Sequence, residues 1–284
     1  MIKRLAFMVL GLLAIASVAC TPKNEGGPSG KLFIIGGGER SDALIEKMLQ
    51  TADLQPKDTV FILPMASSIP DTTTLYIKRQ ILKQGAYAVE SHNFTREEAI
   101  RAKKQIARVA RAKLIYIPGG DQNRFMDVVG DTPLYKALHE AYQGGATLAG
   151  TSAGAAVMSA IMLTGEQKLN VDNGNDVLWK DNIETRQGLG FLSSDIIDQH
   201  FIKRSRFNRL LSVVADHPDK QGIGIDESTA IICHQTWAQV VGEGQVVVLS
   251  APTALDHTAE HLISFEHINF SVFTAGDRFE LFSK

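Results

Sequence analysis

One serine of this chain stands in a setting that suits a nucleophile. The segment GTSAG at 150–154 fits the pattern G-x-S-x-G and lies between an apolar run, 147–149, and a helix-forming run, 155–160. A tight turn from strand to helix presents such a hydroxyl at the edge of a sheet, and the flanking glycines let the backbone turn sharply and a substrate approach. The alternative is a glycine-rich turn with a serine cap. The context favours Ser152 as a nucleophile.

A serine nucleophile needs a general base, and His200 is the best placed of the eight histidines. It closes the run DIIDQH, which has the pattern of a strand ending in polar groups. A third group must hold the imidazole, and Asp226 or Glu227 could do so at the end of the strand-like run 222–225. Asp198 is a third candidate for the acid that orients His200, although it could bind substrate instead. The chain order Ser, His, acid differs from the order Ser, acid, His of α/β-hydrolases and argues against that fold.

Three arginines follow the candidate base within ten residues: Arg204, Arg206 and Arg209. The next segment has the spacing of a helix with a core stripe of Phe207, Leu210, Leu211 and Val214. Arg204 falls on that stripe one turn earlier, where a guanidinium is costly unless it lines a pocket or is paired. A solvated basic helix face therefore fits Arg204 worst, and a pocket for carboxylates is the alternative.

The elements that must position these residues alternate along the chain. Short apolar runs end at glycine or proline, and amphipathic stretches separate them. The apolar runs are 31–35, 59–63, 113–117 and 147–149, and the helix-like stretches are 42–53, 76–84, 95–110 and 133–143. This alternation predicts a parallel sheet covered by helices on both faces, with ligands at the carboxyl ends of its strands.

The character of the sequence changes after about residue 220. Close-spaced strands are predicted at 223–226, 229–233, 238–241 and 245–249, and a further pair at 270–273 and 278–282. The segment GEG at 242–244 has the character of a hairpin connection. The polar stretch 163–190, with DNGN at 172–175, is expected to be a long excursion or a hairpin. Because no linker interrupts 31–284, this part is expected to form a single α/β domain.

The N-terminal segment has the features of an export signal. Lys3 and Arg4 precede an apolar run, 5–19, which is shorter than the roughly 20 residues of a membrane-spanning helix. The run ends in SVAC, which resembles a bacterial lipobox. We therefore expect a lipoprotein-type signal peptide at 1–19, lipidation of Cys20, a flexible tether at 20–30, and an exported protein held to a membrane by the lipid alone. The alternative is a plain secretory signal.

Composition excludes several classes of protein. The 284 residues carry 29 Lys and Arg against 31 Asp and Glu, and the net charge of -2 argues against a nucleic-acid partner. The ordinary apolar content excludes a coiled coil, a collagenous repeat or a disulfide-stapled mini-domain. No cluster has metal-ligand spacing, and GGGE at 36–39 lacks the pattern G-x-G-x-x-G, so neither a metal nor a nucleotide cofactor is expected. Cys233, in an apolar run, is expected to be a small buried hydrophobe.

Four blocks together resemble the cyanophycinase family of serine peptidases. They are PGGDQ (118–122), GTSAGA (150–155), DQHF (198–201) with the three following arginines, and GIDE (224–227). The blocks cover most of residues 31–233, and the resemblance fades towards the C-terminus. It implies a relative of the aspartyl dipeptidases on a fold similar to class I glutamine amidotransferases. That fold is an α/β three-layer sandwich with a mostly parallel central sheet, here with extra β-hairpins toward the C-terminus.

The resemblance also implies an activity and roles for residues. The activity is that of a serine exopeptidase that cuts cyanophycin, a poly-Asp backbone with Arg on each β-carboxylate, into β-Asp-Arg dipeptides. Ser152 would be the nucleophile, His200 the base and Glu227 the residue that orients it, with backbone N–H groups of Gly120 and Ala153 holding the oxyanion. The substrate would be bound by Gln122, Asp198, Gln199, Arg204, Arg206 and Arg209.

Two other activities fit the same residues. One is an aspartyl or isoaspartyl dipeptidase with the same triad, and the other is a non-enzymatic surface lipoprotein that binds acidic peptides. Cyanophycin is usually an intracellular store, so an exported member would scavenge polymer released by other cells. Members of the family are commonly homodimers, so a homodimer is among the expectations.

Overall fold

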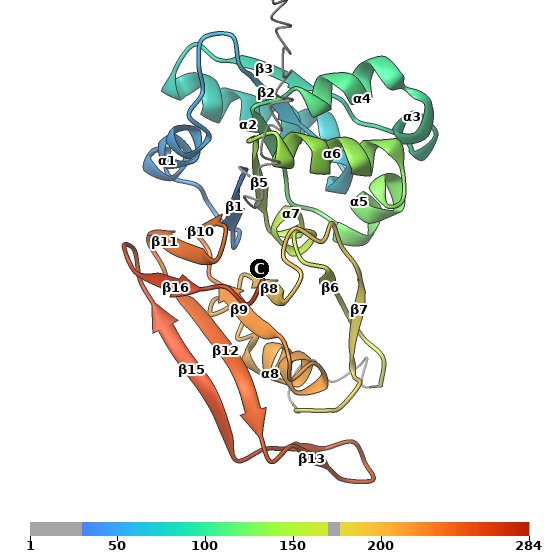
Figure 1. Ribbon diagram of the computed structural model, residues 1–284, viewed down its shortest axis with the longest axis vertical. Coiled ribbons are helices and arrows are strands. Elements are labelled where there is room, and N and C mark those ends of the chain that lie inside the picture. Colours follow the sequence, from blue (N-terminus) through green and yellow to red (C-terminus); the bar gives the residue numbers. More distant parts are fainter. Residues whose placement is uncertain (1–29, 170–176, 284) are drawn as a thin grey trace, which may run out of the picture.

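The computed structural model describes residues 30–169 and 177–283. The predicted signal peptide, Cys20, the tether up to residue 29 and the polar segment 172–175 lie outside the described residues. A sheet of eight strands with its helices forms one part of the molecule, and a sheet of four strands with one helix forms the other (Figure 1). None of the helices in the described ranges has both the length and the apolar character needed to cross a bilayer.

The larger sheet is the predicted parallel sheet with an antiparallel extension. Its strand order is β16-β11-β10-β1-β5-β4-β2-β3, and the five strands from β1 to β3 in this order run parallel. Their bounds are β1 (Lys31–Ile35), β2 (Thr59–Ile62), β3 (Ala88–Ser91), β4 (Leu114–Ile117), β5 (Thr147–Thr151), β10 (Thr229–His234), β11 (Trp237–Gly242) and β16 (Arg278–Glu280). β1, β4 and β5 are buried almost throughout, as their continuous apolar runs predict.

Helices cover both faces of this sheet, which confirms the predicted three-layer sandwich. On one face α1 (Asp42–Ala52) and α2 (Pro70–Gln84) pack against Phe33 and Tyr116 of the strands. The other face is covered by α3 (Arg96–Arg101), α4 (Lys103–Ala110), α5 (Gln122–Val129), α6 (Pro133–Gln143) and α7 (Ala153–Ala156). A short 3-10 turn, Pro64–Ala66, follows β2.

Local capping sets the helix starts. The Ser41 side chain accepts from the Leu44 N–H at the start of α1, and Thr132 accepts from the Tyr135 N–H at the start of α6. Thr95 and Glu98 form a reciprocal capping box at the start of α3. The stretch 95–110, predicted as one helix, is two helices, because Ala102 has ψ 62 and breaks the helical hydrogen-bonding between them.

The second sheet is the feature that the strand predictions missed. Its order is β15-β12-β9-β8, with β8 and β9 parallel and α8 connecting them. The bounds are β8 (Asp195–Gln199), α8 (Phe207–Asp216), β9 (Gln221–Ile225), β12 (Val246–Thr253) and β15 (His267–Phe273). α8 packs on this sheet through a small cluster of its own, consisting of Phe201, Leu210, Val214, Val247 and Leu249.

The hairpin predicted at 242–244 is wrong, and the two strands predicted at 270–273 and 278–282 form but do not pair with each other. GEG at 242–244 does not join paired strands, because it carries the chain from β11 in the first sheet to β12 in the second. Both edges of β11 are already paired, with β10 and β16, so the next strand has to go elsewhere. Likewise β15 pairs with β12 and β16 with β11, rather than with each other. The β10–β11 hairpin does form.

The long polar excursion contains the predicted hairpin. β6 (Ile161–Gln167) pairs antiparallel with β7 (Ile183–Gln187), and Leu163 and Ile183 pack with Ile196 and Val213 of the second sheet region. A small ribbon, β13 (Asp256–His257) and β14 (Ile263–Ser264), lies beyond β12. Cys233 is 2% exposed, as predicted for a small hydrophobe, and burial raises the pKa of its thiol.

Candidate active site

Ser152 occupies a strained turn between β5 and α7. Its backbone has φ 53 and ψ -111, a conformation that a residue other than glycine adopts only when its surroundings hold it there. The two glycines of the motif allow the close packing around this turn. A β-carbon on Gly150 would lie 2.0 Å from the Gly154 carbonyl oxygen, and one on Gly154 would lie 2.0 Å from that of Ile117. This is the geometry expected for a nucleophile elbow.

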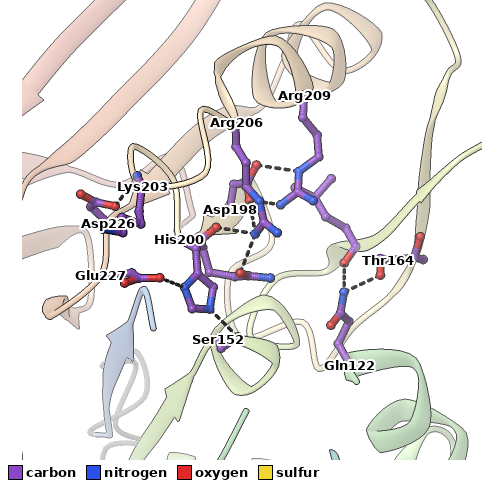
Figure 2. Close-up of polar contacts among 12 residues, drawn as sticks. Gln122, Ser152, Thr164, Asp198, His200, Lys203, Arg206, Arg209, Asp226 and Glu227 are labelled. Carbon is purple, nitrogen blue, oxygen red and sulfur yellow. Dashed lines mark hydrogen bonds and ion pairs between the residues drawn. The ribbon is translucent and has the colours of Figure 1, made fainter. Parts of the chain in front are cut away.

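The imidazole of His200 joins Ser152 to Glu227. His200 Nε2 lies 2.9 Å from Ser152 Oγ, and His200 Nδ1 lies 2.6 Å from Glu227 Oε1, as Figure 2 shows. Asp226, the alternative acid, is used differently, because its carboxylate accepts from the backbone N–H of Lys203 at 2.9 Å. The structure thus brings three sequence-predicted residues into one hydrogen-bonded chain and leaves Asp226 out of it.

The three residues come from two different sheets. Ser152 follows β5 of the larger sheet, whereas His200 and Glu227 follow β8 and β9, parallel neighbours in the smaller sheet. Parallel neighbours end at the same edge, so these two strands deliver the base and the acid side by side. The sequence showed strand ends before both residues but gave no sign that they belong to a separate sheet.

The glycines at 36–38 form the cradle for this chain of contacts. The Gly36 carbonyl accepts from the His200 N–H at 2.7 Å, and a β-carbon on Gly37 would lie 2.2 Å from Cε1 of the His200 ring. A β-carbon on Gly38 would lie 2.7 Å from Cβ of Glu227. Sequence reasoning missed this role, although three consecutive glycines after the first strand were the available signal.

The environment of His200 favours its neutral form. Burial lowers the pKa of His200, the hydrogen bond to Glu227 partly counters this, and the charges of Arg204 and Arg206 lower it further. A neutral imidazole with Nδ1 donating to Glu227 leaves Nε2 as an acceptor facing Ser152 Oγ. That is the protonation state that a general base requires.

The turn after β4 and the start of α7 both lie next to Ser152. A β-carbon on Gly119 would come within 3.2 Å of Ser152 Cβ, so the turn that follows β4 lies against the serine. Gly120 has φ 141 and packs on the Ala66 carbonyl, 2.1 Å from where its β-carbon would be. Ala153 begins α7 immediately after the serine. The two predicted oxyanion donors, Gly120 and Ala153, are the sequence neighbours of Gly119 and Ser152, and their role in holding an oxyanion stays a prediction.

Asp198 does not offer the free acceptor that was expected for a substrate arginine. Its carboxylate is 0% exposed and is held by Arg209, whose Nε donates to Oδ2 at 2.9 Å and whose terminal nitrogen donates to Oδ1. Arg209 is itself 4% exposed. A buried carboxylate has to be paired, and Arg209 satisfies it within the protein. This pair is therefore part of the wall of the site.

Arg206 and Gln199 form a second contact beside that pair. Arg206 NH1 donates to both the backbone oxygen and Oε1 of Gln199 at 2.6 Å, and it lies 3.7 Å from Asp198 Oδ1. Burial lowers the pKa of Arg206 to about 10, helped by the charge of Arg209. The amide oxygen of Gln199 is thus engaged, whereas Arg206 keeps donors beyond this contact.

Arg204 does not lie on the core face of a helix. α8 begins at Phe207, so the helical spacing assumed for Arg204 does not apply, and its side chain is exposed. The turn is closed by the Arg204 N–H, which donates to the His200 carbonyl at 3.0 Å. Arg204 is the arginine of the three that solvent reaches most freely.

Gln122 connects the site to the β6–β7 hairpin. Its amide nitrogen donates to the carbonyls of Leu163 at 3.0 Å and Thr164 at 2.5 Å (Figure 2). Asp121 caps the same helix by accepting from the N–H groups of Asn123 and Arg124. The nitrogen of Gln122 is therefore used within the protein, where it holds the β6–β7 hairpin. Among the described residues, no group of three side chains is arranged to hold a metal ion.

Comparisons with known proteins show which family and which fold the chain resembles. A family model described as peptidase family S51 matches residues 32–241. The chain is 35% identical over 236 residues to a cyanophycinase of Trichormus variabilis, covering 80% of this chain and 77% of the relative. It is 28% identical over 282 residues to a cyanophycinase of Synechococcus elongatus, covering 95% and 85%.

One solved structure shows the same fold. A peptidase from an acI-B1 Actinobacterium superposes with a TM-score of 0.64 at 24% sequence identity. The alignment covers 89% of this chain and 97% of that structure. The likeness therefore extends over both sheets of the described chain.

Proposed function

Because the chain belongs to peptidase family S51, we propose that it is a cyanophycinase-like serine exopeptidase with Ser152 as nucleophile, His200 as base and Glu227 as orienting acid. The observation that carries the assignment is the continuous hydrogen-bonded chain from Ser152 Oγ through the imidazole to Glu227 Oε1. A serine-type peptidase needs this relay, because a serine hydroxyl alone is a weak nucleophile.

The mechanism follows from the contacts. Ser152 Oγ attacks the scissile carbonyl carbon while His200 Nε2 takes the hydroxyl proton, and Glu227 stabilises the imidazolium that forms. The oxyanion accepts from backbone N–H groups at Gly120 and Ala153, each worth about 3–4 kcal/mol in the transition state. His200 then protonates the leaving amine, which leaves an acyl-enzyme. In the second half of the reaction, water attacks the acyl carbonyl while His200 Nε2 takes its proton, and His200 returns that proton to Ser152 Oγ as the ester bond breaks.

The substrate class follows from the charges beside the relay. A β-Asp-Arg unit carries a carboxylate and a guanidinium. Arg204 and Arg206 supply forked donors for the carboxylate, and Arg204 is exposed enough to be the first to meet it. Asp198 and Arg209 form a buried ion pair that supports the pocket and does not contact the substrate. We infer that the products are β-Asp-Arg dipeptides.

The location is a proposal that rests on the N-terminal sequence. The SVAC segment supports cleavage before Cys20, lipidation of that cysteine and export. In that setting the enzyme would act on polymer outside the cytoplasm.

The experiment that tests the activity uses the chain from Thr21 onward. It is incubated with insoluble cyanophycin and, separately, with aspartyl and isoaspartyl dipeptides, and the products are identified by mass. Release of β-Asp-Arg from the polymer is the expected result. Cleavage of dipeptides alone would make the enzyme a dipeptidase with the same relay. Binding of polymer without turnover would overturn the assignment as a peptidase acting on it.

A further inference from the structure

A polar cavity of about 370 Å³ lies between the C-terminal end of α5 and β7, outside the Ser152 relay. Its charged wall consists of Arg96 at the start of α3, Asp127 and Asp131 at the end of α5, and Arg186 on β7. Tyr135 of α6 completes the wall. None of these residues takes part in the mechanism described above.

The charges of this cavity are fixed in place yet still accessible. Arg186 donates to Asp127 Oδ1 at 2.6 Å, while their side chains remain 42% and 62% exposed. Arg96 NH1 donates to the carbonyls of Asp127 at 2.8 Å and Gly130 at 3.0 Å, so its remaining nitrogens stay at the wall. Burial and the charge of Asp131 raise the pKa of the Tyr135 phenol, which donates to the Leu189 carbonyl at 2.9 Å.

The balance of charge indicates the kind of ligand. A divalent cation would require a predominance of carboxylates, and a simple anion a predominance of cations. This cavity presents two guanidinium groups and two carboxylates, which suits a ligand carrying one group of each sign. A β-Asp-Arg unit is such a ligand.

The cavity and the Ser152 relay are connected through α5 and the hairpin. Gln122 begins α5 and binds the carbonyls of β6, and Asp127 follows it by five residues, about 7.5 Å along the helix axis. An extended backbone covers about 3.5 Å per residue, so Asp127 lies about two backbone residues beyond Gln122, which is itself proposed to bind substrate. On the same hairpin, Thr164 Oγ1 donates to Glu184 Oε2 at 3.2 Å, so a carboxylate lies beside the strand that Gln122 contacts.

We propose that this cavity is a second binding site for the polymer, which holds a β-Asp-Arg unit a few residues away from the scissile bond. Arg96 and Arg186 bind its carboxylate, and Asp127 and Asp131 bind its guanidinium. The inference rests on the proposed function. The inference adds that this cavity contributes to the affinity for long substrates and that short substrates do not reach it.

The test compares substrates of different length. Steady-state kinetics are measured with a substrate of two β-Asp-Arg units and with a long soluble oligomer, for the wild type, Arg186→Gln and Asp131→Asn. Each variant is expected to raise KM for the oligomer about fivefold, since an exposed charged contact contributes about 1 kcal/mol, with kcat unchanged. The short substrate should be unaffected. The matched control is Arg101→Gln, whose side chain pairs with Glu97 on the exposed surface of α3.

The outcomes separate this inference from the proposed function. Turnover of the short substrate by the wild type tests the reaction alone. Equal losses on both substrates, or no loss on either, would overturn the second site while leaving the reaction intact. If free β-Asp-Arg alters turnover of the short substrate in the wild type but not in Arg186→Gln, the cavity is an effector site instead and the proposal is wrong.

Discussion

Gly37 lies against the His200 imidazole, so close that a β-carbon at position 37 would be 2.2 Å from the ring Cε1. Gly37→Ala must therefore displace the ring from Ser152. Because a displacement of about 1 Å costs about 100-fold in rate, we expect kcat/KM to fall by about that factor. Gly276→Ala is the matched control, since Gly276 also has positive φ (99) but nothing within 4 Å. Similar losses of activity in both variants would mean that backbone strain, and not the ring contact, is responsible.

That contact illustrates what the sequence can and cannot predict. The apolar runs between turn residues predicted the larger sheet, because strands buried on both faces have a continuous apolar pattern. Ser152 and His200 could be predicted because each stands at a strand end with a reactive side chain, whereas the choice of Glu227 over Asp226 came from the family resemblance. The role of the glycines at 36–38 could not be predicted. A glycine has no side chain, so its role depends on which residues of the folded protein pack against it.

The second sheet escaped prediction for a related reason. Pairing between distant strands depends on which edges are still available, and a local pattern does not report this. The pairing of Asp198 with Arg209, eleven residues apart, was likewise hidden. Both side chains read as substrate-binding groups in the sequence, and only their burial shows that they satisfy each other.

Removing the nucleophile or its support tests the relay directly. Ser152→Ala should lower kcat by about five orders of magnitude, and Glu227→Gln by about three to four, because the base loses its target or its orientation. Steady-state assays on polymer measure the loss of kcat, and thermal unfolding checks that both variants remain folded. The midpoint of unfolding should stay near that of the wild type. Normal turnover by Ser152→Ala would remove the serine mechanism.

The pH dependence of kcat/KM should report the lowered pKa of His200. The neutral imidazole is the active form, so activity is kept at neutral pH and is lost as the pH falls through a pKa below the usual 6.5. Arg204→Ala removes a charge that lowers this pKa, so the acid limb should move to higher pH. Arg204→Lys keeps the charge and should leave the limb in place. An acid limb that does not move in Arg204→Ala would show that the charge of Arg204 does not contribute to this pKa.

The N-terminal prediction has its own test. In the full chain, Cys20→Ser should prevent lipidation and release the protein from membranes into the soluble fraction. Fractionation followed by immunodetection measures this, with Cys233→Ser as the control, since that thiol is buried in β10. Membrane association of Cys20→Ser equal to that of the wild type would contradict the predicted lipid anchor.

We expect the loss of Arg209 to lower the free energy of unfolding more than it lowers the affinity for substrate. Arg209→Met leaves Asp198 as a buried carboxylate with its main partner removed, which costs about 3–5 kcal/mol in the free energy of unfolding. Replacing both members, Asp198→Leu with Arg209→Met, should recover most of that loss, because no buried charge then remains unpaired. Denaturant unfolding curves of the three proteins measure this. If Arg209→Met keeps the wild-type stability but raises KM for polymer, Arg209 binds the substrate itself, and the pair is not a wall of the pocket but part of its recognition surface.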